Sequence, residues 1–144
     1  MSQEIDYSSM PRSYVVCWNR QCPRRQECLR QLAAEHLPED KKTVMSVNLR
    51  SVTVTERGCP QMRLVNFVRN AYGMRHIYDD VRVADREPLY RAIWMRLGNT
   101  MYYRYRNGKR AITPEVQAVV ESAFHQFGYT DPIRYDRYAD ELSW

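Results

Sequence analysis

The second half of the chain repeats apolar residues every three or four positions, which is the spacing of an amphipathic helix. The clearest stripe comprises Val116, Val119, Val120, Ala123, Phe124 and Phe127. It follows Thr113, Pro114 and Glu115, which favour a helix start because they supply an N-cap, a first-turn proline and an acid near the positive end of the helix dipole. A glycine closes each apolar pattern. The sequence therefore predicts helices over residues 85–97, 100–107 and 113–127.

The first half of the chain has shorter and less regular patterns. Residues 13–16, 43–47 and 51–55 alternate or cluster β-branched residues, which is typical of short strands. Residues 23–37 and 60–72 place apolar side chains at helical spacing. We therefore expect a mainly α fold with a small β element (α+β), with a cysteine-clustered N-terminal half and a helix-turn-helix-like C-terminal half.

The length of 144 residues suits one domain. With only five glycines and seven prolines, the chain has no segment that resembles a flexible linker. We expect one compact unit made of an N-terminal arm (1–12), a cysteine-cluster region (13–84), a helical region (85–130) and a C-terminal tail (131–144).

No part of the sequence resembles a membrane span, because no wholly apolar run is longer than five residues. The polar start, MSQEIDYSSMPRS, lacks the apolar segment of a secretory signal. We therefore expect a cytoplasmic protein. In a reducing compartment, four cysteines are thiols or metal ligands more often than disulfides.

The four cysteines are Cys17, Cys22, Cys28 and Cys59, with the spacing C-x4-C-x5-C-x30-C. Two of them precede proline, which predicts that Cys22 and Cys59 sit at helix N-termini, where a thiolate is favoured. Clustered thiolates can hold Zn²⁺ or a [4Fe–4S] cluster, and the spacing does not choose between these two. The alternative is that the cysteines are small buried side chains or a reactive thiol.

The net charge of +5 comes from 22 basic residues, of which 19 are arginine, and the chain also holds 11 tyrosines. Arginine grips phosphate and stacks on rings, so this composition is compatible with a nucleic-acid partner as well as with an ordinary solvated surface. The stretch of residues 102–110 interleaves tyrosines with arginine and lysine and contains no acidic residue. Its candidate nucleic-acid contacts are Tyr102, Tyr103, Arg104, Arg106, Lys109 and Arg110. The alternative is that its tyrosines pack in a core and its arginines are only solvated.

Residues 97–132 resemble the helix-turn-helix headpiece of lac-repressor-type regulators. The matching residues, in the order of that family, are Arg104, Asn107, Gly108, Lys109, Thr113, Pro114, Glu115, Gly128, Tyr129 and Pro132. The resemblance implies that the helix ending near Asn107 acts as a recognition helix for DNA.

The whole chain is also similar to a small bacterial family of unknown function. The resemblance is carried by CxxxxCPxxxxCLR over residues 17–30, by Gly58-Cys59-Pro60, by Tyr102-Tyr103-Arg104 ahead of Thr113-Pro114-Glu115, and by the tail Asp136-x-Tyr138…Trp144. It implies a cytosolic cysteine-motif protein and supplies no activity.

The sequence lacks the P-loop, G-x-S-x-G and H-E-x-x-H motifs, so an enzyme would have to work through its cysteines, and we assign no catalytic residue. The leading hypothesis is a metal-binding protein that binds nucleic acid and acts as a transcriptional regulator. The second is an iron–sulfur or thiol redox sensor that docks an acidic partner. The third is a structural adaptor without a metal.

Overall fold

The computed structural model describes residues 3–144, which form two compact units. The first unit runs up to Phe67 and takes in Leu142–Trp144, and the second comprises Val68–Glu141. The division between the two units lies earlier in the chain than the predicted boundary at residue 84. The last three residues belong with the N-terminal part of the chain.

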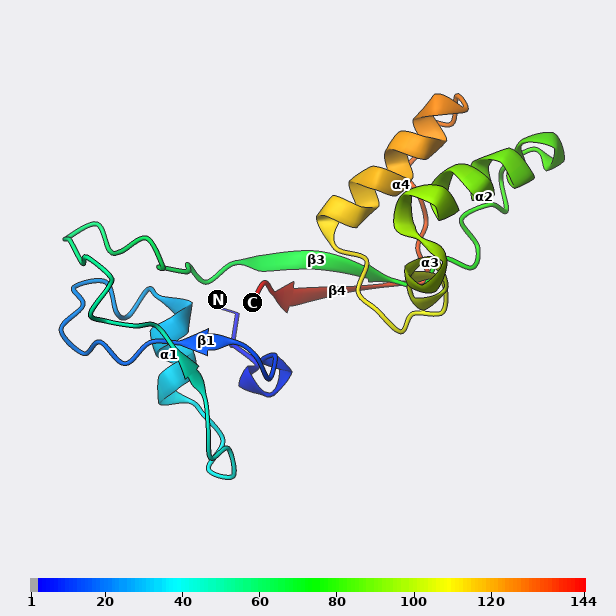
Figure 1. The fold of residues 1–144 in the computed structure, drawn as a ribbon. Helices are drawn as coiled ribbons and strands as arrows, with labels where there is room; N and C mark the ends of the chain where they lie inside the picture. Colours follow the sequence, from blue (N-terminus) through cyan, green and yellow to red (C-terminus); the bar gives the residue numbers. More distant parts are fainter. Residues whose placement is uncertain (1–2) are drawn as a thin grey trace. The chain divides into compact units, whose positions relative to one another are not determined.

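The first unit is built from short elements around one helix (Figure 1). These are the 3₁₀ helix η1 (Tyr7–Ser9), β1 (Val15–Val16), α1 (Leu29–Glu35) and β2 (Met45–Ser46). Strands β1 and β2 are parallel, with Val15 opposite Met45, and α1 is the crossover between them and packs on β1. Such a β–α–β arrangement buries one face of the helix.

The core of the first unit is small. Its cluster of buried apolar residues consists of Val16, Ala33 and Ala34, and Leu29 is also fully buried. Two cysteines, Cys17 and Cys28, are buried nearly as deeply. A unit of this size with so few large buried side chains gains little free energy from apolar burial alone.

The second unit contains the longer elements. These are β3 (Phe67–Tyr72), α2 (Val83–Leu97), α3 (Asn99–Arg106), α4 (Pro114–Gln126) and β4 (Arg137–Leu142). Strands β3 and β4 pair as a two-stranded antiparallel ribbon, and α2 packs against both α3 and α4 (Figure 1). The enclosed core comprises Ala71, Met74, Ile77, Val81, Leu89, Ile93, Tyr102, Tyr105, Ile112, Val120, Ala123, Phe124 and Tyr135.

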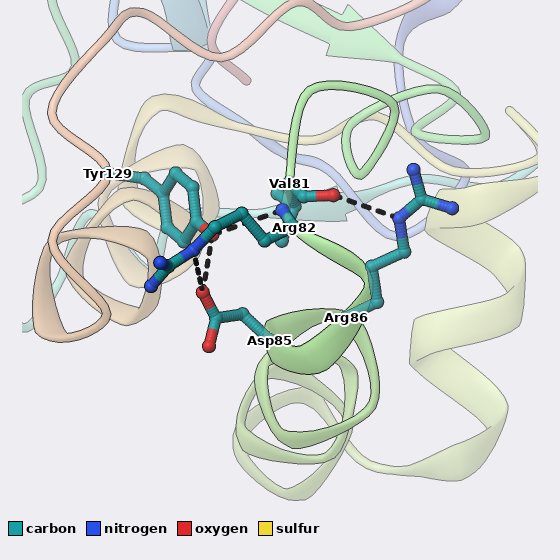
Figure 2. Close-up of polar contacts among 5 residues, drawn as sticks. All are labelled: Val81, Arg82, Asp85, Arg86 and Tyr129. Atoms are coloured by element: carbon teal, nitrogen blue, oxygen red, sulfur yellow. Dashed lines mark hydrogen bonds and ion pairs between the residues drawn. The ribbon is translucent and has the colours of Figure 1, made fainter.

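A polar cluster around Tyr129 fixes the start of α2 (Figure 2). The Tyr129 hydroxyl donates to Asp85 Oδ2 (2.5 Å) and accepts from the backbone N–H of Arg82 (3.1 Å). Arg82 Nε also donates to the same carboxylate (3.2 Å), and Arg86 Nε donates to the carbonyl of Val81 (3.0 Å). The hydrogen bond from Tyr129, followed by the one from Arg82, lowers the pKa of Asp85 below its ordinary value of 3.8, against an opposing effect of burial.

Replacing Tyr129 by phenylalanine is expected to lower the melting temperature of the protein in a pH-dependent way. A carboxyl whose pKa falls on folding adds stability above its ordinary pKa, and this is lost as the pH drops through the folded value. The deficit of Tyr129→Phe should therefore be full near neutral pH and shrink from about pH 5 to about pH 2. Far-ultraviolet circular dichroism melts would measure it. Tyr138→Phe is the control, because that hydroxyl donates to the neutral carbonyl of Ile133. Equal pH dependence of the two deficits would contradict this role of Asp85.

The structure confirms a small α+β fold with 32% helix and 15% strand, so "mainly α" overstates the helix content. The three helices of the second half lie within two residues of their predicted bounds. The predicted helix over 60–72 is wrong, because Phe67–Tyr72 is strand β3. The predicted helix over 23–37 begins only at Leu29, and 51–55 forms an isolated bridge instead of a strand.

Between residues 3 and 144, no helix combines the length and the apolar composition that crossing a membrane requires.

Candidate functional site

One cavity in the first unit brings the four cysteines together. Cys17, Cys22, Cys28 and Cys59 all contribute to its lining, although Cys59 is more than thirty positions from Cys28 in the sequence. All four are free thiols. The remaining wall is largely apolar, and it comprises Val47, Leu49, Val52, Val54 and Met62, with Asn19, Arg30, Gln31 and Gln61 at the polar positions.

The two buried cysteines are held by regular structure. Cys17 directly follows β1, and its N–H donates to the carbonyl of Arg30 (3.0 Å). Cys28 is the N-cap residue of α1, and it forms an antiparallel bridge with Leu64. These two thiols are therefore fixed by the packing of α1 against β1 and by the chain segment around Leu64.

The other two cysteines lie in turns, so the prediction that both begin helices is wrong. The N–H of Cys22 donates to the carbonyl of Asn19 (3.2 Å) within a turn. Cys59 follows a tight turn in which Thr55 and Gly58 exchange two backbone hydrogen bonds of 2.9 Å. Gly58 has φ +99°, and a Cβ there would lie 2.5 Å from the sulfur of Met62. Glycine adopts this backbone conformation without strain and leaves room for the Met62 side chain.

The pKa of Cys17 depends on its burial and on the other three thiols. Burial raises the pKa of Cys17, the backbone N–H of Asn19 lowers it by hydrogen bonding, and the thiolates of Cys28, Cys59 and Cys22 raise it again. Three other thiols thus act on one sulfur through space. A cation placed among them would reverse this effect, because it favours every thiolate around it.

The cavity has a volume of about 20 Å³. A cavity needs roughly 10–15 Å³ to hold one water molecule, so this space fits a single small particle. In the part of the chain that the structure describes, no three His, Cys, Asp or Glu side chains converge in the geometry of a bound ion. The four thiols therefore line the cavity but do not lie in the arrangement that would coordinate a metal ion.

The candidate nucleic-acid residues divide between the core and the surface of the second unit. Tyr102 is 1% exposed, and its hydroxyl lies 3.0 Å from that of Tyr78. The prediction that Tyr102 contacts a nucleic acid is therefore corrected, because its ring is part of the core. The exposed members are Tyr103, Arg104, Arg106, Lys109 and Arg110, which we call the α3 surface.

The α3 surface is strongly basic. A shallow hollow there is lined by Tyr103, Arg104, Asn107 and Lys109. Among residues 3–144, none of the ion pairs involves a cation of this surface. The charges are therefore not neutralised by neighbouring carboxylates, and they remain available to an anionic partner.

The connection between α2 and α3 is shorter than the turn that the resemblance to lac-repressor-type headpieces implies. A helix-turn-helix joins its helices by a turn of three or four residues. Here α2 ends at Leu97 and α3 begins at Asn99, with only Gly98 (φ +82°) between them. The basic helix is present, but the tight connection is not the one that the resemblance implies.

The model of a protein family described as a family of unknown function (DUF6078) matches residues 1–144. The chain belongs to the DUF6078 family. No curated protein and no solved structure matches it significantly. The predicted membership of a family of unknown function is thereby confirmed, and the chemistry has to be argued from the residues.

In this DUF6078 protein, sequence reasoning missed the residues that surround the cysteines. The apolar wall from Val47 to Met62 has no motif, because its members line one cavity only after the chain has folded. Exposed Trp18, next to Cys17, was also missed. The sequence offered one signal for this residue: Trp18 is aromatic, lies beside the predicted ligand Cys17 and is followed by arginines.

Proposed function

We propose that this DUF6078 protein binds a single zinc ion through Cys17, Cys22, Cys28 and Cys59, and that the ion stabilises the first unit. The observation that carries the proposal is the lining of one cavity by all four thiols. Four thiolates in tetrahedral arrangement form a structural zinc site. Free thiols in a first unit without a disulfide are also consistent with a reducing, cytoplasmic location.

The small cavity supports zinc as the simpler occupant. Its volume of about 20 Å³ suits one small particle, and a single ion needs less rearrangement of the thiols than a [4Fe–4S] cluster of eight atoms. Zinc binds thiolates at about 2.3 Å, which requires the sulfurs to approach one another to roughly 3.8 Å. Cys22 and Cys59 lie in turns, so movement of these turns would complete the set around Cys17 and Cys28, which regular structure holds in place.

The weak core of the first unit supplies a reason for a metal. Its strands have two residues each, and its helix has seven. Domains below about 70–80 residues commonly need a disulfide or a metal as a staple. Because the four cysteines are free thiols, zinc binding is the way in which they can stabilise the first unit.

Elemental analysis and an absorption spectrum of anaerobically purified full-length protein test the proposal. We expect one zinc per chain and no visible band. Cys59→Ser should lose the zinc, and Gln61→Ala should keep it, because Gln61 lines the same cavity without a thiol. Iron with sulfide and a broad visible band would overturn the zinc assignment in favour of a redox sensor. Protein without metal would overturn the metal site.

A second function, nucleic-acid binding, is favoured by the uncompensated charge of the α3 surface. Arg104, Arg106, Lys109 and Arg110 combine phosphate-binding cations with the exposed ring of Tyr103. Contacts of this kind act mainly on the backbone of the nucleic acid, so binding must weaken steeply with salt. A role as transcriptional regulator would follow from sequence preference at this surface.

A further inference from the structure

A groove in the first unit lies next to the cysteine cavity. It is lined by Cys17, Trp18, Arg20, Arg25, Gln31, Ala34 and Glu35, and its volume is about 420 Å³. This volume falls within the roughly 300–1,000 Å³ of small-ligand sites. The groove is therefore large enough for one nucleotide, whereas the cysteine cavity is not.

The groove and the cysteine cavity share a wall. Cys17 and Gln31 contribute to the lining of both. The Gln31 side chain is buried and donates from Nε2 to the carbonyl of Asn19 (2.7 Å), two residues after Cys17. A metal held by Cys17 would thus fix segment 17–19, and with it the position of Trp18.

The groove offers one ring and two cations. Trp18 is 48% exposed, and no aromatic ring of residues 3–144 stacks on it. Arg20 and Arg25 are exposed, and neither takes part in an ion pair of the described chain. Arg25 Nη1 donates to the backbone carbonyl of Arg20 (3.1 Å), which holds the Arg25 side chain next to the backbone of Arg20. Glu35 is the only acid in the lining.

We propose that this groove binds an unpaired nucleotide of a single-stranded nucleic acid, with the base stacked on Trp18 and the adjacent phosphates on Arg20 and Arg25. The proposal deepens the nucleic-acid function and rests on it. An exposed indole with flanking cations is the combination that single-strand sites use, since every base offers a flat face for stacking. A duplex hides those faces, so the groove selects unpaired bases. The excess of positive charge in the lining disfavours a cationic ligand and favours an anionic one.

The test is fluorescence anisotropy of zinc-loaded full-length protein with a short fluorescein-labelled oligothymidylate and with a duplex of the same length. Trp18→Ala is expected to weaken oligothymidylate binding about tenfold and to leave duplex binding unchanged. Trp18→Phe should retain most of the affinity, because a ring remains. Removing both Arg20 and Arg25 should lower the salt slope for the single strand by about 0.7 per contact. Met45→Ala is the control, since Met45 is exposed in the same unit but outside the groove.

The outcomes separate the groove from the α3 surface. If Trp18→Ala binds oligothymidylate as tightly as the unaltered protein, the groove proposal is overturned even when duplex binding persists. If single-strand binding depends on Trp18 while α3 variants bind duplex normally, the groove is supported and the α3 surface is not. If the unaltered protein binds neither probe, both are overturned.

Discussion

Removing zinc with EDTA is expected to unfold the first unit of the protein and to leave the second unit folded. The first unit has a buried cluster of only Val16, Ala33 and Ala34, whereas the second has thirteen buried residues in its cluster. Structural zinc supplies about 10–16 kcal/mol in small zinc-dependent domains. A unit with so small a core loses most of its stability without such a contribution.

Hydrogen exchange followed by mass spectrometry measures this effect separately for each unit. After EDTA treatment, amides of β1 and α1 should lose their protection, and amides of α2 and α4 should keep theirs. Restoring zinc should restore the protection, and a variant with serine at all four cysteine positions should resemble the EDTA-treated protein at any zinc concentration. Unchanged protection of α1 in the metal-free protein would contradict the staple. Loss of protection in both units would show that the metal does not act on the first unit alone.

The helices of the second unit could be predicted because local signals there agree with the packing. Thr113, Pro114 and Glu115 mark the start of α4, and glycines follow the ends of α2 and α4. The apolar stripe of α4 faces the core, as its buried Val120 and Phe124 show. Where the capping residues, the spacing of apolar residues and the buried face agree, the sequence alone is sufficient to predict a helix.

The strand β3 could not be predicted, because its partners are distant in the sequence. Its residues pair with β4, and Ala71 also exchanges backbone hydrogen bonds with Ile112 (3.0 and 2.7 Å). Val65, Val68 and Tyr72 happen to fall at helical spacing, which favoured the wrong element. Strand formation depends on such non-local pairing more than on local propensity.

The candidate site was predictable in composition but not in geometry. Cysteine count and compartment indicated a shared site, and the four thiols do line one cavity. The prolines after Cys22 and Cys59 predict helix starts at these two cysteines, but the cysteine at a helix N-cap is Cys28. The inward direction of Tyr102 depends on how α3 packs against α2, and the hydroxyl of Tyr78 that meets it is far away in the sequence.

Removing the four cations of the α3 surface is expected to weaken duplex binding steeply and to flatten its salt dependence. Each lost phosphate contact lowers the slope of log K against log salt by about 0.9. A variant with alanine at Arg104, Arg106, Lys109 and Arg110 should therefore lose up to about 3.6 of that slope, if all four cations contact phosphate. Anisotropy titrations with a labelled duplex between about 50 and 200 mM salt measure the slope directly.

Two controls decide whether the surface or the total charge is responsible. Alanine at four exposed cations outside this surface, namely Arg12, Lys42, Arg50 and Arg134, removes the same charge from other positions. That variant should keep most of the slope, because contact ions act locally whereas distant charges are screened within about 10 Å. Tyr102→Phe should leave the affinity unchanged, because Tyr102 is buried. Equal losses in the two fourfold variants would assign the binding to net charge, and the α3 surface would then have no specific role.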